Sequence, residues 1–318
     1  MSKADKRIDG VDLQILKLLT LNSRTSYRSI GKTLGVSVNT VRSHINELIL
    51  NKAIEHFVAQ VNFSLFGYSQ VLTILLKFNK NRQKGIENVV KSTRDLGPVY
   101  MHIEILDEVD VIGIAVKGLL IDNDNIDPLR KNISKALGRG ISVLDVFFGN
   151  FKSSVSEKFR MNKIDFEIIE CLLLDPRMTF LNIARKIGCS QKTIIRRIEK
   201  MESNHVITGF SLQYNPSRMR GYNYFSVLLR TRSNMAAEVM KEISYSDLNK
   251  NILTLPPFMF PDRVIIVFHI QNAFDIESII SRIRSINGVI RAEAYQPIRI
   301  KWHEDWLKKK IKDRINSF

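Results

Sequence analysis

Polar and basic side chains gather on one face of two short amphipathic helices that the sequence predicts, one after Ser37 and the other after Ser190. Amide, hydroxyl and guanidinium groups of this kind bond base edges and phosphates, and an α-helix is slim enough to enter the major groove of DNA. The chemistry that these side chains suit is therefore contact with nucleic acid. The candidate contact residues are Ser37, Asn39, Thr40, Arg42, Ser43, Asn46, Ser190, Lys192, Thr193, Arg196 and Arg197.

The opposite face of each of these helices is apolar. In the first helix Val41, Ile45 and Leu48 lie within about 60° of one another at about 100° per residue, so this stripe must face a core. The same spacing recurs in the second helix. Ordinary helical bundles also have polar outer faces, so a solvated surface without a ligand is the alternative interpretation. The elements around the two helices favour the first interpretation.

Both helices belong to an internal repeat. A shift of 153 positions places residues 11–57 over residues 164–210 without a gap, and one inserted residue later the register resumes at Gly67 against Gly221. So long an ungapped match indicates that a unit of about half the chain is duplicated. Identical pairs include Asp12 and Asp165, Ile15 and Ile168, Arg24 and Arg177, Gly35 and Gly188, Ser37 and Ser190, Thr40 and Thr193, Ile45 and Ile198, Ile54 and Ile207, and Phe57 and Phe210.

Each copy begins with the pattern of a helix-turn-helix. In the first copy, apolar residues at helical spacing predict a first helix, and a second short helix at 26–34 ends at Gly35, since a helix end commonly needs a left-handed residue. Two residues later Ser37 can cap the third helix by accepting a hydrogen bond from its free N–H groups. The β-type run at 54–59 suits a wing strand. The second copy repeats these features 153 positions later.

The remainder of each copy follows the order βαββαβ. This order is typical of the ferredoxin-like fold, in which two helices cover one face of a four-stranded antiparallel sheet. Apolar residues on both faces of 71–78 and 263–270 indicate that one sheet packs on the other. The predicted elements are 69–79, 84–95, 98–106, 109–117, 125–138 and 141–149 in the first copy, and 223–232, 234–244, 251–259, 262–270, 275–286 and 289–296 in the second.

The fold class that follows is α+β, with two winged helix-turn-helix (HTH) domains alternating with two ferredoxin-like βαββαβ domains. The expected boundaries are 1–62 for the first winged HTH domain, 63–150 for the first ferredoxin-like, sensor-type domain, 151–162 for a linker, 163–215 for the second winged HTH domain, 216–298 for the second ferredoxin-like, sensor-type domain, and 299–318 for a basic amphipathic C-terminal helix.

The charge of the chain is unevenly distributed. Its 318 residues include 48 Lys and Arg against 32 Asp and Glu, a net charge of +16. Residues 1–60, 158–215 and 299–318 each carry +4, whereas residues 68–150 are close to neutral. Positive charge concentrated at the predicted HTH domains favours double-stranded DNA as the partner.

Other function classes find little support in the composition. Cys171 and Cys189 both lie in apolar helical patterns, which indicates buried thiols in a reducing compartment rather than a disulfide or a metal pair. The six histidines show no spacing typical of a metal site or a catalytic triad. Neither the N-terminus nor any apolar run predicts a signal peptide or a membrane span. We therefore expect a cytoplasmic, non-enzymatic protein without a metal, a cofactor or a membrane partner.

These features resemble the Lrp/AsnC family, also called feast/famine regulators, in its archaeal form. The strongest matches are the leader Asp12-Leu13-Gln14-Ile15-Leu16, the turn Asn22-Ser23-Arg24, the stretch 30–37 and, in the second copy, Ser190, Thr193, Arg196, Arg197 and Ile198. The resemblance covers nearly the whole chain twice. It implies a transcription factor that pairs through its βαββαβ domains and wraps or bends DNA. Usual members carry one copy per chain, so this chain resembles a covalently fused pseudo-dimer.

The resemblance also implies an amino-acid effector between the βαββαβ domains, but the sequence departs from the family there. Family chains usually have Thr-Gly before an aspartate in the loop between the second and third strands, and the glycine lets the backbone approach the effector. Here Leu106-Asp107-Glu108-Val109-Asp110 and Phe258-Met259-Phe260-Pro261-Asp262 lack that glycine. Asp110 and Asp262 match the family's aspartate and are the candidate effector-binding residues. Whether an effector exists, and whether the chain self-associates through these domains, stays open.

Two other functions stay open beside DNA binding. Sirohaem decarboxylases are similar to this family and share its architecture, with a histidine-rich aromatic strand that His102 in residues 98–102 matches only weakly, because the partner strand at 251–259 has no histidine. A lone histidine on a strand is more often structural. A winged-helix module that binds protein is the other alternative, and the basic Lys192 and Arg196 favour DNA over it.

Overall fold

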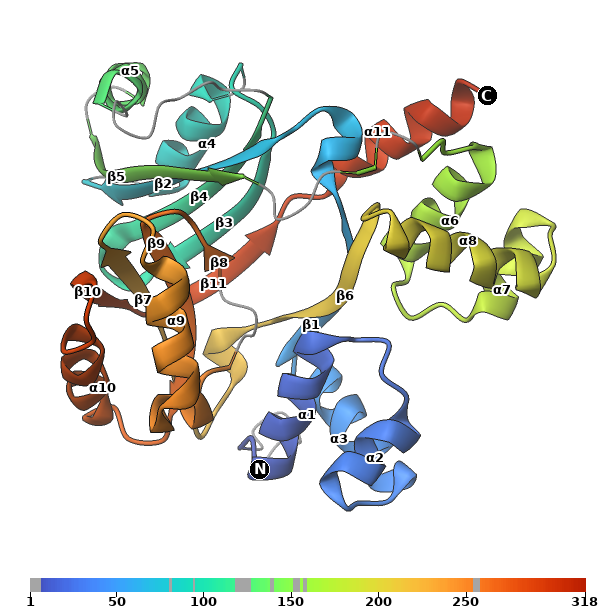
Figure 1. Ribbon diagram of the computed structural model, residues 1–318, viewed down its shortest axis with the longest axis horizontal. Helices are drawn as coiled ribbons and strands as arrows, with labels where there is room; N and C mark the ends of the chain where they lie inside the picture. The colour runs from blue at the N-terminus through green and yellow to red at the C-terminus, as the bar shows by residue number, and fades with distance from the viewer. Residues whose placement is uncertain are drawn as a thin grey trace.

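The computed structural model describes residues 7–79, 82–93, 95–117, 127–137, 140–150, 155–156, 159–253 and 258–318. Two helical lobes lie beside a pair of stacked sheets, and a two-stranded ribbon crosses between the lobes (Figure 1). Parts of the predicted linker at 151–162, of the predicted helix at 125–138 and of the predicted strand at 251–259 fall outside the described residues.

The first HTH domain contains α1 (Gly10–Leu21), α2 (Tyr27–Leu34), α3 (Val38–Leu50) and strand β1 (Ile54–Val61). Its helices begin at Asp9, Ser26 and Ser37, and the side chain of each accepts a hydrogen bond from a backbone N–H of the first turn. Because these N–H groups have no partner within the helix, the caps fix where each helix begins. Gly35, with a φ of 68°, ends α2 in the left-handed conformation that the sequence predicts.

The second HTH domain repeats this construction with α6 (Lys163–Leu174), α7 (Phe180–Ile187), α8 (Gln191–Ser203) and strand β6 (Ile207–Tyr214). The caps Asn162, Thr179 and Ser190 lie 153 positions after those of the first domain. The apolar stripes on α3 and α8 are buried, as the helical spacing predicts. Two HTH domains with the same local signals therefore form at the two predicted places.

The two ferredoxin-like domains have the strand order of that fold. The first domain contains β2 (Gln70–Phe78), α4 (Arg82–Ser92), β3 (Val99–Ile105), β4 (Val109–Val116), α5 (Asp127–Leu137) and β5 (Ile141–Asn150). The second contains β7 (Asn223–Thr231), α9 (Ala236–Tyr245), β8 (Phe258–Met259), β9 (Arg263–Ile270), α10 (Asp275–Arg284) and β10 (Val289–Tyr295). Their sheets run β3-β4-β2-β5 in the first domain and β10-β7-β9-β8 in the second, with all neighbours antiparallel. The predicted fold class is confirmed.

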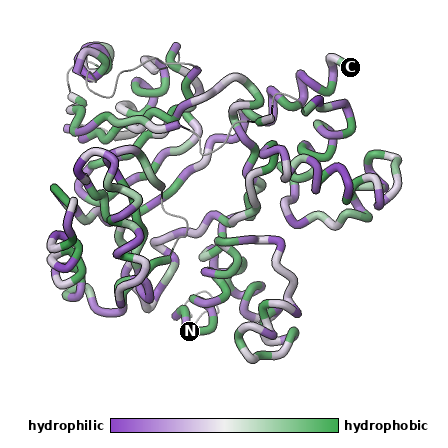
Figure 2. Tube along the Cα trace, viewed as in Figure 1, coloured by the Kyte–Doolittle hydropathy of each residue, from purple (hydrophilic) through white to green (hydrophobic). Residues whose placement is uncertain are grey.

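The open faces of the two sheets pack on each other, and the helices cover their outer faces (Figure 1). Leu75 and Phe147 of the first domain are buried in one cluster with Leu228 of the second. The strands of these sheets are mainly hydrophobic, which agrees with burial on both sides (Figure 2). Within the predicted strand at 251–259, Asn251 ends the 3-10 helix η5 (Asp247–Asn251), Ile252 makes an isolated antiparallel bridge to Phe268, and β8 forms the last two residues, while 254–257 lie outside the described residues.

The prediction of a helix over residues 299–318 is wrong in its first part. Residues Pro297–Trp302 form β11, which joins the edge of the first sheet by pairing antiparallel with β3. Apolar and basic residues alternate in this stretch with the period of a strand, whereas the helical period begins only near Trp306. Helix α11 (Asp305–Asn316) then packs on α6, with Leu307 and Ile311 buried in the core of the second HTH domain.

Among the described residues, no helix combines the length and the apolar character needed to cross a bilayer.

Candidate nucleic-acid interface

Four of the predicted contact residues hold the beginnings of α3 and α8. The Ser37 hydroxyl accepts a hydrogen bond from the Thr40 N–H (3.0 Å) and lies 2.8 Å from the Thr40 hydroxyl. Ser190 and Thr193 make the same contacts, at 3.1 and 2.9 Å. These hydroxyls are first of all helix caps. They fix the direction in which the N-terminal turn of each helix points.

The remaining polar residues of α3 face outward. Asn39, Arg42, Ser43 and Asn46 are exposed, and none of their side chains makes a hydrogen bond or ion pair with another residue that the structure describes. Their donors and acceptors are therefore free for a ligand. An amide matches the N7 and N6 groups of adenine, and a guanidinium contacts phosphates.

Helix α8 presents different side chains at the equivalent positions. Lys192 takes the place of Asn39, and Arg196 takes the place of Ser43; both are exposed and make no ion pair within the described part of the chain. A guanidinium fits the O6 and N7 acceptors of guanine, while a lysine suits either guanine or phosphate. The two helices thus share their caps and their buried apolar stripes but differ in their exposed side chains.

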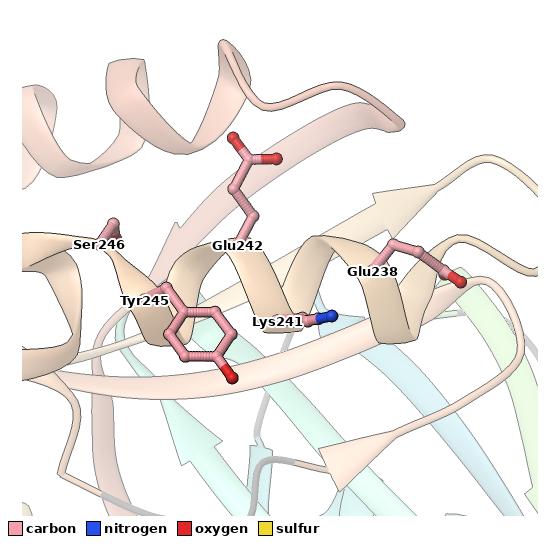
Figure 3. Close-up of a pocket in the computed structure, with 5 residues that line it drawn as sticks. All are labelled: Glu238, Lys241, Glu242, Tyr245 and Ser246. Carbon is pink, nitrogen blue, oxygen red and sulfur yellow. The ribbon is translucent and has the colours of Figure 1, made fainter.

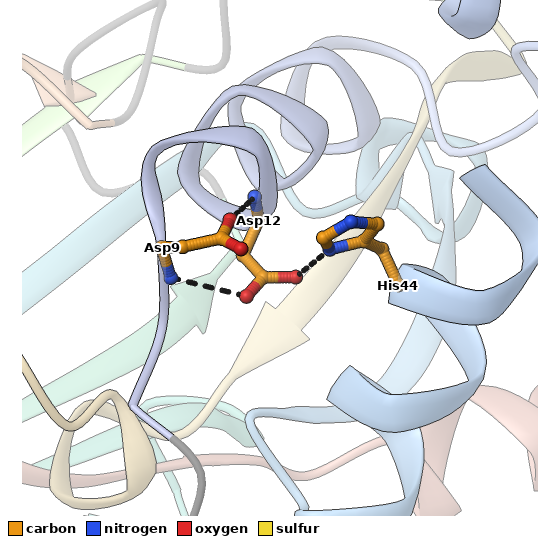
Figure 4. Close-up of side chains that lie close together, drawn as sticks. All are labelled: Asp9, Asp12 and His44. Atoms are coloured by element: carbon orange, nitrogen blue, oxygen red, sulfur yellow. Dashed lines mark hydrogen bonds and ion pairs between the residues drawn. The ribbon is translucent and has the colours of Figure 1, made fainter. Parts of the chain in front are cut away.

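Arg197 belongs to the interior of its domain rather than to this outward face. Its Nη1 lies 3.3 Å from Asp165 Oδ2 at the beginning of α6, and only about a fifth of its side chain is exposed (21%). In the first copy, His44 occupies the equivalent position, and its Nδ1 lies 2.6 Å from Asp12 Oδ1 (Figure 4). Both contacts tie the third helix to the beginning of the first helix.

The cluster Asp9, Asp12 and His44 is compact enough to suggest a cation site (Figure 4). The carboxylates are already engaged, because Asp9 accepts from the Asp12 N–H (2.8 Å) and Asp12 accepts from the Asp9 N–H (3.1 Å). The second copy has the same reciprocal cap with Asn162 in the place of Asp9 and Arg197 in the place of His44. The Asn162 amide and the Arg197 guanidinium keep the same contacts in the second copy, although neither group is a usual cation ligand. The cluster is therefore a helix-capping arrangement.

Strands β1 and β6 set the two HTH domains side by side by pairing with each other antiparallel (Figure 1). Each strand also completes the core of the other domain: Leu212 and Tyr214 are buried in the first HTH core, and Ala59 and Val61 in the second. The sequence predicts a strand in each place but contains no local signal for this partner, because the paired residues lie about 150 positions apart.

The two candidate effector residues lie in different surroundings. Asp110 is fully buried on β4, where its Oδ2 lies 2.9 Å from His102 Nε2. Asp262 is partly exposed and forms an ion pair with the neighbouring Arg263. Arg263 is itself buried and reaches Asp145 of the opposite sheet at 3.2 Å. Each of the two carboxylates therefore already contacts a basic side chain of the protein: His102 for Asp110 and Arg263 for Asp262.

The two aspartates are not equivalent, which corrects the match made from the sequence. Asp110 pairs with Leu76 of β2, and the position that corresponds to Leu76 in the second copy is Arg230. Arg230 pairs with Arg263, so Arg263 is the counterpart of Asp110. A hollow along α9, lined by Glu238, Lys241, Glu242, Tyr245 and Ser246, contains neither aspartate (Figure 3).

Comparison with known proteins agrees with the two HTH domains. Residues 161–202 match the model of the AsnC-type helix-turn-helix domain, and residues 8–54 match that of a winged helix-turn-helix DNA-binding domain. An uncharacterized HTH-type transcriptional regulator of Pyrococcus horikoshii is 32% identical over 108 residues, which cover 34% of this chain and 71% of that protein. The chain belongs to the Lrp/AsnC family.

Other proteins similar to this chain include the regulator LrpA of Pyrococcus horikoshii, 27% identical over 127 residues, or 39% of this chain and 86% of LrpA. The crystal structure of the siroheme decarboxylase NirDL aligns with 97% of this chain and 99% of its own, at 15% identity and a TM-score of 0.48. Each of these two regulators matches little more than a third of this Lrp/AsnC chain.

His102, the residue that matches the decarboxylases only weakly in sequence, lies in the interior of this Lrp/AsnC chain. Its side chain is 2% exposed and is held by Asp110. The neighbouring Tyr100 is also buried, and burial raises the pKa of its phenol well above the usual range. His102 and Asp110 thus form a structural pair between neighbouring strands β3 and β4.

Proposed function

We propose that this chain is a sequence-specific, DNA-binding transcription regulator whose two halves act as a covalently fused pair. The observation that carries the proposal is the exposed polar face of two capped third helices, α3 and α8, on HTH domains joined by the β1–β6 pairing. Membership of the Lrp/AsnC family supports it. The function needs no catalytic group or cofactor, and it places the protein with the chromosome, in the cytoplasm of a prokaryotic cell.

Two identical recognition helices favour a palindromic DNA site. A fused pair whose recognition helices differ can bind a site with two different halves. In this proposal Asn39 and Asn46 read an A/T-leaning half-site, and Arg196 reads a half-site that contains guanine. Arg42 and Lys192 contact phosphates and supply affinity without sequence preference. Self-association through the ferredoxin-like domains would place several such pairs on one DNA.

A mobility-shift series with increasing salt tests the proposal. We expect nanomolar binding that weakens steeply with salt, because each neutralised phosphate releases a condensed counterion. Lys192→Ala should reduce the slope of log affinity against log salt by about one. The control Lys91→Ala removes an exposed lysine from α4, in a ferredoxin-like domain, and should leave the slope unchanged.

Absence of DNA binding even at low salt would contradict the proposal. The decarboxylase alternative makes a different prediction, since it requires a bound tetrapyrrole. A coloured purified protein, or tight binding of an iron porphyrin together with loss of DNA binding, would support that alternative instead.

A further inference from the structure

Arg24, in the turn between α1 and α2, reaches into the second HTH domain. Its guanidinium carbon lies 4.7 Å from the ring centre of Phe180 and 5.1 Å from that of Phe210. Its Nη1 and Nη2 donate to the carbonyl oxygens of Pro176 (2.6 Å) and Met178 (3.1 Å). One side chain thus makes both stacking and hydrogen-bond contacts across the boundary between the domains.

Arg177 makes the reciprocal contact from the other side. It lies 153 positions after Arg24, and its guanidinium carbon is 5.0 Å from the ring centres of both Tyr27 and Phe57. These two rings are the counterparts of Phe180 and Phe210 in the repeat. The stacking of arginine on aromatic rings therefore occurs twice, once in each direction, as at the two-fold interface of a homodimer, whereas within the described residues only Arg24 also donates to backbone carbonyls.

The position of Arg24 is electrostatically unfavourable, because its charge is partly buried and lies close to that of Arg177. Burial lowers the pKa of Arg24, and the positive charge of Arg177 lowers it further. Asp175 and Glu202 oppose this effect with negative charge. Two arginines held close together and partly out of water need a compensating gain, and stacking on aromatic faces supplies it.

The β1–β6 ribbon alone is a weak spacer. Two-stranded ribbons twist more than larger sheets and are only marginally stable by themselves. The arginines brace the two domains at the turns that precede α2 and α7, beside the ribbon. Further links here are the hydrogen bonds from Ser23 N–H to the Phe210 carbonyl (3.0 Å) and from the Ser211 hydroxyl to the Thr20 carbonyl (2.8 Å).

We propose that Arg24 and Arg177 are positioning residues for recognition: they fix the separation and relative rotation of α3 and α8, and so determine which half-site spacing the protein accepts. This inference rests on the DNA-binding function proposed above. Because B-DNA turns once in about 10.5 base pairs, one inserted base pair rotates a half-site by about 34°. If α3 and α8 are held rigidly, the protein binds the altered spacing less tightly. If the contact between the domains is loosened, the two helices can move to fit the altered spacing.

The test uses operators selected by the wild-type protein, with the spacer between the half-sites lengthened or shortened by one or two base pairs. Wild type should bind the best spacing about tenfold more tightly than its neighbours. The double variant Arg24→Ala/Arg177→Ala should discriminate less than about threefold. Arg24→Lys/Arg177→Lys should behave like the alanine variant, because an ammonium keeps the charge but lacks the planar group that stacks.

Two controls separate positioning from a general loss of structure. All variants should bind DNA with one half-site scrambled as wild type does, and Arg284→Ala, on α10 of the second ferredoxin-like domain, should keep the wild-type spacing preference. A measurement without DNA uses spin labels on cysteines introduced at Asn39 and Lys192, in a background without Cys171 and Cys189. The distribution of distances between the labels should broaden in the alanine variant.

An unchanged spacing ratio in the alanine variant overturns the inference, whatever the label distances show. Failure of the proposed function has a different signature, since wild type itself would then select no DNA sequence.

Discussion

The two HTH domains agree in the residues that build them and differ in the residues that face outward. The caps Ser37 and Ser190 and the carboxylates Asp12 and Asp165 occupy matching positions and make matching contacts. Among the outward positions of α3 and α8, the pairs that differ include Asn39 and Lys192, Arg42 and Ile195, Ser43 and Arg196, and Asn46 and Glu199. The fold restricts the residues of the first set, whereas the exposed residues of the second set make no contact that holds the domain together.

The domains also differ in what supports them from outside. The first HTH core is completed by the second ferredoxin-like domain, through Leu253 and Val267 among others. The second is completed by α11, through Leu307 and Ile311. The two HTH cores of the duplicated unit therefore rely on two different neighbours.

Shortening a buried side chain that completes one HTH core from outside should change the relative stability of the two HTH domains most. Ile311→Ala removes a fully buried side chain, and such substitutions cost about 2–5 kcal/mol. Hydrogen exchange should show loss of protection in α6 while α1 keeps its protection. The matched variant Leu253→Ala should loosen α1 and spare α6. Equal loosening of both helices by either variant would mean that the two HTH domains unfold as one unit.

Acid should distinguish the two ferredoxin-like domains. Burial, reinforced by the nearby Lys17 ammonium, lowers the pKa of His269 on β9 to about 4, whereas Val116 takes its place in the first copy. The unfolded state binds this proton more readily, so the stability that His269 contributes is complete above pH 6.5 and declines as the pH falls to 4.

The loss of unfolding free energy from this histidine should reach roughly 3 kcal/mol at pH 4. Urea unfolding of wild type and His269→Leu, between pH 7 and pH 4, measures it as the difference between the two pH dependences. If the unfolding free energies of the two proteins depend on pH in the same way, His269 takes up its proton in the same pH range in the folded and the unfolded state, and the prediction is wrong.

Removing one cap from each third helix should have the smallest effect and should be equal in the two copies. Ser37→Ala and Ser190→Ala each lose one hydrogen bond to a backbone N–H, which costs about 1 kcal/mol. Thermal unfolding of the two variants checks this. A large effect in one copy alone would show that its serine does more than cap the helix.

Local signals predicted the parts of the fold that depend on nearby residues. Gly35, Ser37 and the stripe at Val41 follow from helix geometry and capping, so the HTH domains and the exposure of Asn39 and Asn46 could be predicted from the sequence. The stacking of the two sheets also followed, because residues 71–78 are apolar on both faces.

Contacts between distant segments could not be predicted in this way. The β1–β6 pairing and the addition of β11 to the first sheet depend on edges that no local period identifies. Arg197 was assigned to the outward face because its position on the helix allows both directions, and the Asp165 carboxylate draws it inward. The identity of Arg24 and Arg177 was visible in the repeat, but only their aromatic partners across the domains reveal their role.

Selection of bound sequences from random DNA, carried out with wild type, Asn39→Ala and Arg196→Ala, tests most directly whether the two halves read different sequences. Wild type should select an asymmetric site with an A/T-leaning half and a half that contains guanine. Arg196→Ala should relax one half at a cost of roughly 1–3 kcal/mol, and Asn39→Ala should relax the other. A short palindrome bound by a single chain, or loss of preference at the same positions in both variants, would contradict the fused-pair account.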